Sequence, residues 1–87
     1  MTTEWDELSA LADEYGPEGW LINHGVFGGF DAYLGEVGPP PMVLHDRTPS
    51  RLGERVAEFR RVWDASPHLA ARERRDAAER AANDLET

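Results

Sequence analysis

The sequence predicts a small α+β domain: an N-terminal helix, a small antiparallel hairpin or three-stranded sheet, and two C-terminal helices. Three observations support this. Apolar residues recur at helical spacing over residues 3–15, a glycine-rich turn separates two short apolar runs within 20–36, and two long helical patterns follow Thr-Pro and Ser-Pro pairs. A chain of 87 residues suits one small domain, so we expect residues 1–87 to fold together.

The first helix is predicted over about residues 3–15. Its apolar stripe recurs every three or four residues and consists of Trp5, Leu8, Leu11, Ala12 and Tyr15. Thr2 or Thr3 can cap the start, where acidic residues also suit the helix dipole. We expect Gly16 to take a left-handed conformation after the last turn and Pro17 to prevent continuation.

A hairpin is predicted over about residues 20–36. Gly28 and Gly29 can form a two-residue loop with positive φ, which would place His24 opposite Tyr33 and Phe27 opposite Phe30. The alternative is a pair of short helical turns. Because each glycine weakens a helix by about 1 kcal/mol relative to alanine, the glycines between 19 and 36 favour the hairpin.

The rest of the chain predicts an edge strand and two helices. Residues 38–41 form a stiff connector, and a third strand follows at 42–45. Thr48 can cap a helix over about 49–65 whose apolar stripe is Leu52, Val56, Phe59 and Trp63. Ser66-Pro67 predicts the start of a last helix over about 67–86 with an alanine-rich stripe, which buries little area per residue.

Charge divides the chain into two halves. The net charge is −8, all nine basic residues are arginines, and the first of them is Arg47. The acidic half should attract basic surfaces and repel nucleic acid. The arginines after Arg47 alternate with acids at helix-neighbour spacing, which is typical of a solvated, ion-paired face. We therefore expect no direct contact with nucleic acid.

No motif indicates a catalytic or cofactor site. The HGVFGGF segment has neither dinucleotide-binding nor P-loop spacing, and no basic residue is near it in sequence. Cysteine is absent, and the three histidines are about twenty residues apart, without the pairing of a zinc module. If the strands near 22–26 and 42–46 were adjacent, His24, His45 and Asp46 could meet and form a general base or a metal site.

We therefore expect a small acidic protein, not an enzyme, that binds a protein partner and uses no cofactor, no metal and no membrane. The N-terminus lacks the basic start and apolar stretch of a signal peptide, so a cytoplasmic location is expected. The sharpest hypothesis is an inhibitor or mimic that occupies a basic, nucleic-acid-binding surface, encoded by a phage or mobile element. One alternative is an assembly or adaptor subunit that binds, or self-associates, through its last helix. Another is a small histidine-based enzyme or metal-binding protein. The candidate partner-binding residues are Glu4, Glu7, Asp13, Glu14, Glu18, Ala77, Ala78 and Ala81.

Overall fold

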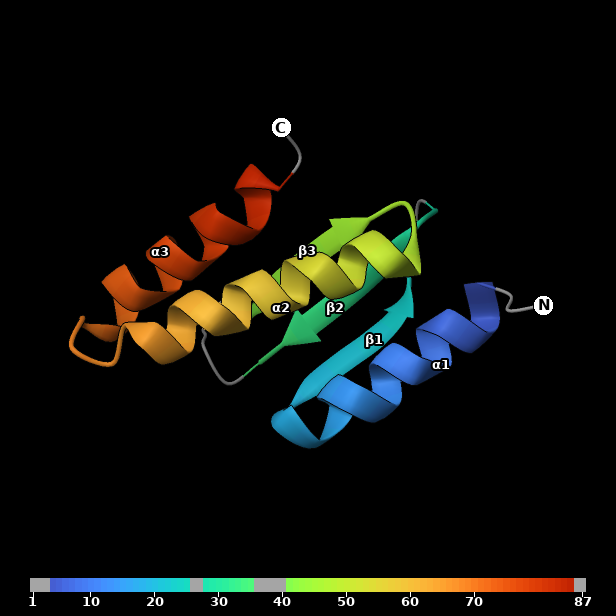
Figure 1. Cartoon of the computed structure of the whole chain (residues 1–87), viewed down its shortest axis with the longest axis horizontal. Coiled ribbons are helices and arrows are strands. Elements are labelled where there is room, and N and C mark those ends of the chain that lie inside the picture. The colour runs from blue at the N-terminus through green and yellow to red at the C-terminus, as the bar shows by residue number, and fades with distance from the viewer. Residues whose placement is uncertain (1–3, 26–27, 36–40, 86–87) are drawn as a thin grey trace. The chain divides into compact units, whose positions relative to one another are not determined.

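The computed structural model describes residues 4–25, 28–35 and 41–85 (Figure 1). The elements run in the order α1 (Glu4–Tyr15), 3-10 helix η1 (Gly16–Glu18), β1 (Trp20–His24), β2 (Phe30–Leu34), β3 (Met42–Asp46), α2 (Pro49–Ala65) and α3 (Ala71–Asp84). This is the predicted α+β fold, with a three-stranded sheet rather than a hairpin alone. The chain divides into two compact units, Met1–Gly53 and Glu54–Thr87.

In the first unit the three strands form an antiparallel sheet in the order β1-β2-β3. The hairpin prediction is confirmed, and so is the edge position of the third strand. The predicted register is wrong by three residues, because His24 lies opposite Phe30 rather than Tyr33. A longer loop causes the difference: the N–H of Gly25 donates to the carbonyl of Gly29 (3.0 Å), so the turn begins at Gly25. Phe27 lies outside the described residues.

The register gives the sheet one buried and one exposed face. Residues directly opposite each other share a face, so one face carries the apolar residues Trp20, Phe30, Ala32, Leu34, Met42 and Leu44, all of which are buried. The side chains between them point to the other face, which is largely exposed. This alternation is typical of an antiparallel sheet that is covered on one side.

Helix α1 runs alongside β1 (Figure 1). Its Leu8 and Tyr15 are buried, as the stripe predicts. The predicted termination is wrong in one respect: Gly16 begins η1, and the left-handed residue is Gly19, with φ 99°. The cause is Pro17, whose fixed φ suits the first turn of a helix, so the chain makes one further 3-10 turn. The predicted caps Thr2 and Thr3 lie outside the described residues.

Helix α2 begins as the sequence predicts. Pro49 is its first residue, and the hydroxyl oxygen of Thr48 accepts the N–H of Arg51 at 3.2 Å. Of the predicted stripe, Leu52, Val56 and Phe59 are buried.

The second unit contains most of α2 and all of α3, which lie side by side in antiparallel directions. Arg55 contacts Ala82 near the end of α3, and Trp63 contacts Arg74 near its start. The predicted start of α3 at Pro67 is wrong, because a backbone turn in which Leu69 donates to the Ser66 carbonyl (3.2 Å) comes first. Ala70 is extended, and the helix begins at Ala71 without a side-chain cap.

Candidate interaction surfaces

The exposed side of α1 is acidic. The helix contributes four exposed carboxylates, Asp6, Glu7, Asp13 and Glu14. Asp6–Glu7 and Asp13–Glu14 are seven residues apart, which is two helical turns or about 10.5 Å, so the two pairs share one side of the helix. Glu4 begins the same helix, and Glu18 is half-buried in η1.

Trp5 differs from the rest of the predicted stripe, because it is 64% exposed. Its ring stacks on His24, with centroids 5.5 Å apart and planes at 18°. His24 in turn contacts Phe30 on the central strand, at 5.1 Å between centroids. The start of α1 therefore lies over the buried face of the sheet, and His24 belongs to an aromatic cluster.

The alanine stripe of α3 is partly or fully covered by the chain itself. Ala78 is fully buried, whereas Ala77 and Ala81 are half-buried. Because its side chain is not at the surface, Ala78 offers nothing to a partner helix without a rearrangement of α3. Small side chains permit this burial because they let a helix approach its neighbours closely.

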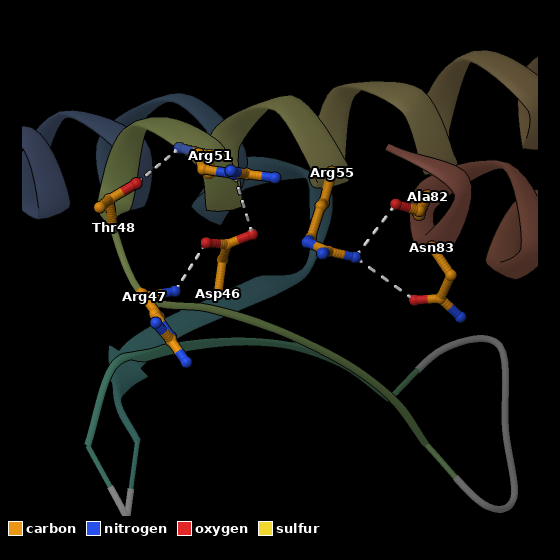
Figure 2. A network of polar contacts seen from close by, with 7 residues as sticks. All are labelled: Asp46, Arg47, Thr48, Arg51, Arg55, Ala82 and Asn83. Atoms are coloured by element: carbon orange, nitrogen blue, oxygen red, sulfur yellow. Dashed lines mark hydrogen bonds and ion pairs between the residues drawn. The ribbon is translucent and has the colours of Figure 1, made fainter. Parts of the chain in front are cut away.

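Arg55 anchors the end of α3. This side chain is 3% exposed and donates to the carbonyl oxygen of Ala82 (3.2 Å) and the side-chain oxygen of Asn83 (3.5 Å) (Figure 2). Carbonyl groups in the last turn of a helix lack intrahelical partners, and a guanidinium satisfies them well. The contact explains why an arginine at this position is buried.

His24, His45 and Asp46 do not meet. β2 lies between β1 and β3, so the outer strands are not adjacent and the condition for a cluster of these three residues is not met. His24 and Asp46 flank Phe30 on the buried face, whereas His45 lies opposite Asp31 on the exposed face. Consecutive strands pair more often than not, and that rule would have placed the strand of Asp31 beside the strand of His45 without fixing which residues face each other.

Asp31 and His45 form a close pair that sequence reasoning missed. Nδ1 of His45 lies 2.6 Å from Oδ1 of Asp31, and their side chains are 54% and 31% exposed. A carboxylate that holds Nδ1–H is the arrangement that orients a histidine for acid–base work. Here, however, the other edge of the ring packs on the hairpin loop: an ideal Cβ at Gly29 would lie 2.9 Å from Nε2. The pair therefore joins β3 to the loop.

Asp46 has a structural role at the start of α2. It is 8% exposed, accepts the backbone N–H of Arg47 at 2.6 Å, and lies 3.6 Å from Nε of Arg51 (Figure 2). A carboxylate beside the N-terminus of a helix is favoured by the helix dipole. This contact gives Asp46 a structural role in place of the histidine–aspartate site considered as an alternative.

The exposed face of the sheet carries an apolar row. Leu21, Tyr33 and Val43 lie directly opposite one another on the three strands, and they are 59%, 38% and 51% exposed. The next row along the strands is polar and consists of Asn23, Asp31 and His45. Sequence reasoning missed this row, because the wrong register put Leu21 and Tyr33 on opposite faces.

Two arginines of α2 form local ion pairs, as their spacing predicts. Arg61 donates to Glu58, which holds the pKa of that carboxyl below its ordinary value of 4.5, and Arg60 lies 3.5 Å from Asp64. Such exposed pairs contribute little to stability.

Within residues 4–25, 28–35 and 41–85, no three His, Asp or Glu side chains are placed to hold a metal ion. In the same ranges, none of the helices has the length and apolar character that crossing a membrane requires. Comparison with known proteins finds no match among family models, curated proteins or solved structures. Any functional proposal therefore rests on the residues themselves.

Proposed function

We propose that this chain is a small protein-binding protein whose helix α1 engages a basic surface on its partner. The observation behind this proposal is the exposed acidic side of α1. Two pairs of exposed carboxylates lie there two helical turns apart, Asp6–Glu7 and Asp13–Glu14. No lysine or arginine precedes Arg47, so the part of the chain before it is strongly acidic. Opposite charges steer association and fix the orientation of a complex.

The sharpest form of the proposal is that the partner's basic surface is one that binds nucleic acid. The four carboxylates from Asp6 to Glu14 are spread over eight residue steps, or about 12 Å of helix axis, which is one charge per 3–4 Å. Duplex DNA carries one charge per about 1.7 Å of axis. The helix is therefore a sparser anion than DNA, sufficient to occupy a short stretch of a basic groove, and it competes with nucleic acid for the same side chains.

The test is a charge reversal on α1 with a matched reversal elsewhere. In the variant, Glu7, Asp13 and Glu14 are replaced by lysine; in the control, Glu54, Glu73 and Asp76 are replaced. All six side chains are exposed, and both sets change the net charge equally. Proteins retained from the source cell by the wild-type chain are identified, purified and measured for association rate at about 50 and about 300 mM salt.

We expect the α1 variant to associate at least about tenfold more slowly, the control to associate nearly as fast as wild type, and the wild-type rate to fall steeply with salt. A duplex oligonucleotide should displace the chain from its partner. Equal losses in the two variants would mean that net charge alone matters, which contradicts a role for α1. Binding that persists in the presence of saturating duplex would reject the mimic form of the proposal.

A further inference from the structure

Trp5 is the most exposed large apolar side chain among the described residues, and it lies in the first turn of the acidic helix α1. Its exposed fraction, 64%, leaves most of an indole in contact with water. Burial of an aromatic side chain is favourable, and tryptophan is enriched among the residues that carry the energy of protein–protein contacts. The proposed function rests on charge and gives this side chain no role.

His24 holds the Trp5 ring in one orientation. The two rings stack with centroids 5.5 Å apart and planes at 18°, so the imidazole covers one face of the indole. Because the side chain is nevertheless 64% exposed, its other face is accessible to a partner. A ring that is already oriented loses little conformational freedom on binding, which favours affinity.

Carboxylates accompany the accessible indole along α1. Trp5, Ser9 and Asp13 follow one another at intervals of four residues, so they lie on one side of the helix, and all three are exposed. The exposed pair Asp6–Glu7 follows Trp5 directly in the chain. A cation over an indole is attracted by the negative face of the ring, and carboxylates within a Debye length add to that attraction. This side of the helix therefore complements a cationic side chain.

We infer that Trp5 binds the guanidinium of an arginine on the basic partner, and that it makes the acidic side of α1 prefer arginine to lysine. The inference rests on the proposed function and names the residue type that α1 recognises. A guanidinium is planar and weakly hydrated, so it stacks on an aromatic face more readily than the strongly hydrated ammonium of lysine. The chain already contains such a contact, because Cζ of Arg74 lies 4.1 Å from the centroid of the Trp63 ring.

The test uses two capped peptides of equal length and charge, hexa-arginine and hexa-lysine, with the full chain at about 50 mM salt. From Trp5 to Glu14 the helix advances nine residues, or about 13.5 Å, and an extended hexapeptide is long enough to cover that distance. The chain has three tryptophans, and the indole N–H signal of Trp5 is the one that Trp5→Leu removes from the NMR spectrum. Hexa-arginine should shift this signal, and hexa-lysine should shift it less.

Trp5→Leu keeps an apolar side chain on His24 but removes the aromatic face. It should weaken the binding of hexa-arginine by about two- to fivefold, the usual value of an exposed cation–π contact, and change the binding of hexa-lysine by less than about twofold. Tyr33→Leu is the matched control, because it removes an aromatic side chain that is 38% exposed on the sheet, and it should bind both peptides like wild type. Thermal unfolding checks that each variant folds. Trp5→Leu binding hexa-arginine as well as wild type, or losing both peptides equally, would overturn the inference.

The α1 charge-reversal variant separates this inference from the proposed function. Loss of both peptides on charge reversal, with no effect of Trp5→Leu, would leave the proposed function standing and reject the role of Trp5. Binding of both peptides that charge reversal does not weaken would contradict the proposed function itself, as would a wild-type chain that binds neither peptide, and the inference would fail with it.

Discussion

At Gly29 the space that a side chain would need is already filled. An ideal Cβ there would lie 2.7 Å from the ring of His45 and 2.8 Å from the carbonyl oxygen of Asp46. Gly28 differs, because it also has a positive φ, of 98°, but nothing lies within 4 Å of its Cβ position. The two adjacent glycines are therefore required for different reasons, one for conformation alone and one for conformation and space.

Alanine substitutions should separate these reasons. Gly28→Ala should lower the free energy of unfolding by about 1–2 kcal/mol, the cost of a left-handed alanine. Gly29→Ala should lower it by about 2–4 kcal/mol, since neighbouring atoms must also move. Gly16→Ala is the control, with no positive φ and open space around it. Urea unfolding measures all three, and equal effects at 28 and 29 would contradict the packing of His45 on the loop.

At the scale of elements, arginines hold both ends of α3. Near its start, Nε of Arg74 donates to the carbonyl of Trp63 (2.6 Å), and the guanidinium lies 4.1 Å from the centroid of the indole. Near its end, Arg55 holds Ala82 and Asn83. A helix whose buried face is alanine gains little from apolar area, so directed polar contacts contribute a large share of its docking.

Arg74→Lys should therefore loosen α3 although it keeps the charge. Lysine cannot stack as a plane or donate from the Nε position, so we expect a loss of about 1–2 kcal/mol in the free energy of unfolding. Amide hydrogen exchange over residues 71–84 should quicken. Arg72→Lys, at an exposed position two residues earlier in the same helix, is the control and should be neutral. Similar effects of the two substitutions would show that the Trp63 contact contributes nothing.

At the scale of the whole molecule, charge and core are distributed unequally. The acids of α1 and the exposed apolar row belong to the unit Met1–Gly53, whereas eight of the nine arginines lie within α2 and α3. The boundary between the units falls inside α2, which is a continuous helix from Pro49 to Ala65. Phe59, in the second unit, is among the largest fully buried side chains.

Phe59→Ala tests whether the chain unfolds as one domain, as we expect from its length. The substitution should lower the free energy of unfolding by about 3–5 kcal/mol, a large part of what a small domain has. Leu85→Ala removes an exposed apolar side chain and should change it by less than about 0.5 kcal/mol.

Amide exchange at Ala32 in β2 and at Ala78 in α3 provides the second readout for Phe59→Ala. In a single cooperative domain, both amides should lose protection together. Loss confined to α3 would mean that the two units unfold separately. An unchanged unfolding midpoint would instead identify the α2 stripe as a surface for a partner.

The sequence by itself determined the class of fold, the helices and the distribution of charge, because these depend on local signals. The spacing of Leu52, Val56 and Phe59, the Thr48-Pro49 helix start and the positive-φ glycines of the hairpin are all found where local rules place them. The acidic character of α1 is likewise a property of composition and helical periodicity. None of these features depends on how the strands pair or on what packs against the sheet.

Tertiary structure alone decided the register and everything that depends on it. A loop that starts at Gly25 rather than at Gly28 shifts the pairing by three residues, and an odd shift moves every side chain to the opposite face. That shift placed Leu21 opposite Tyr33, and the β2–β3 register placed Val43 opposite Tyr33 and His45 opposite Asp31. The burial of Ala78 was likewise decided by tertiary structure. Periodicity identifies an apolar stripe, but only packing decides whether the chain itself or a partner covers that stripe.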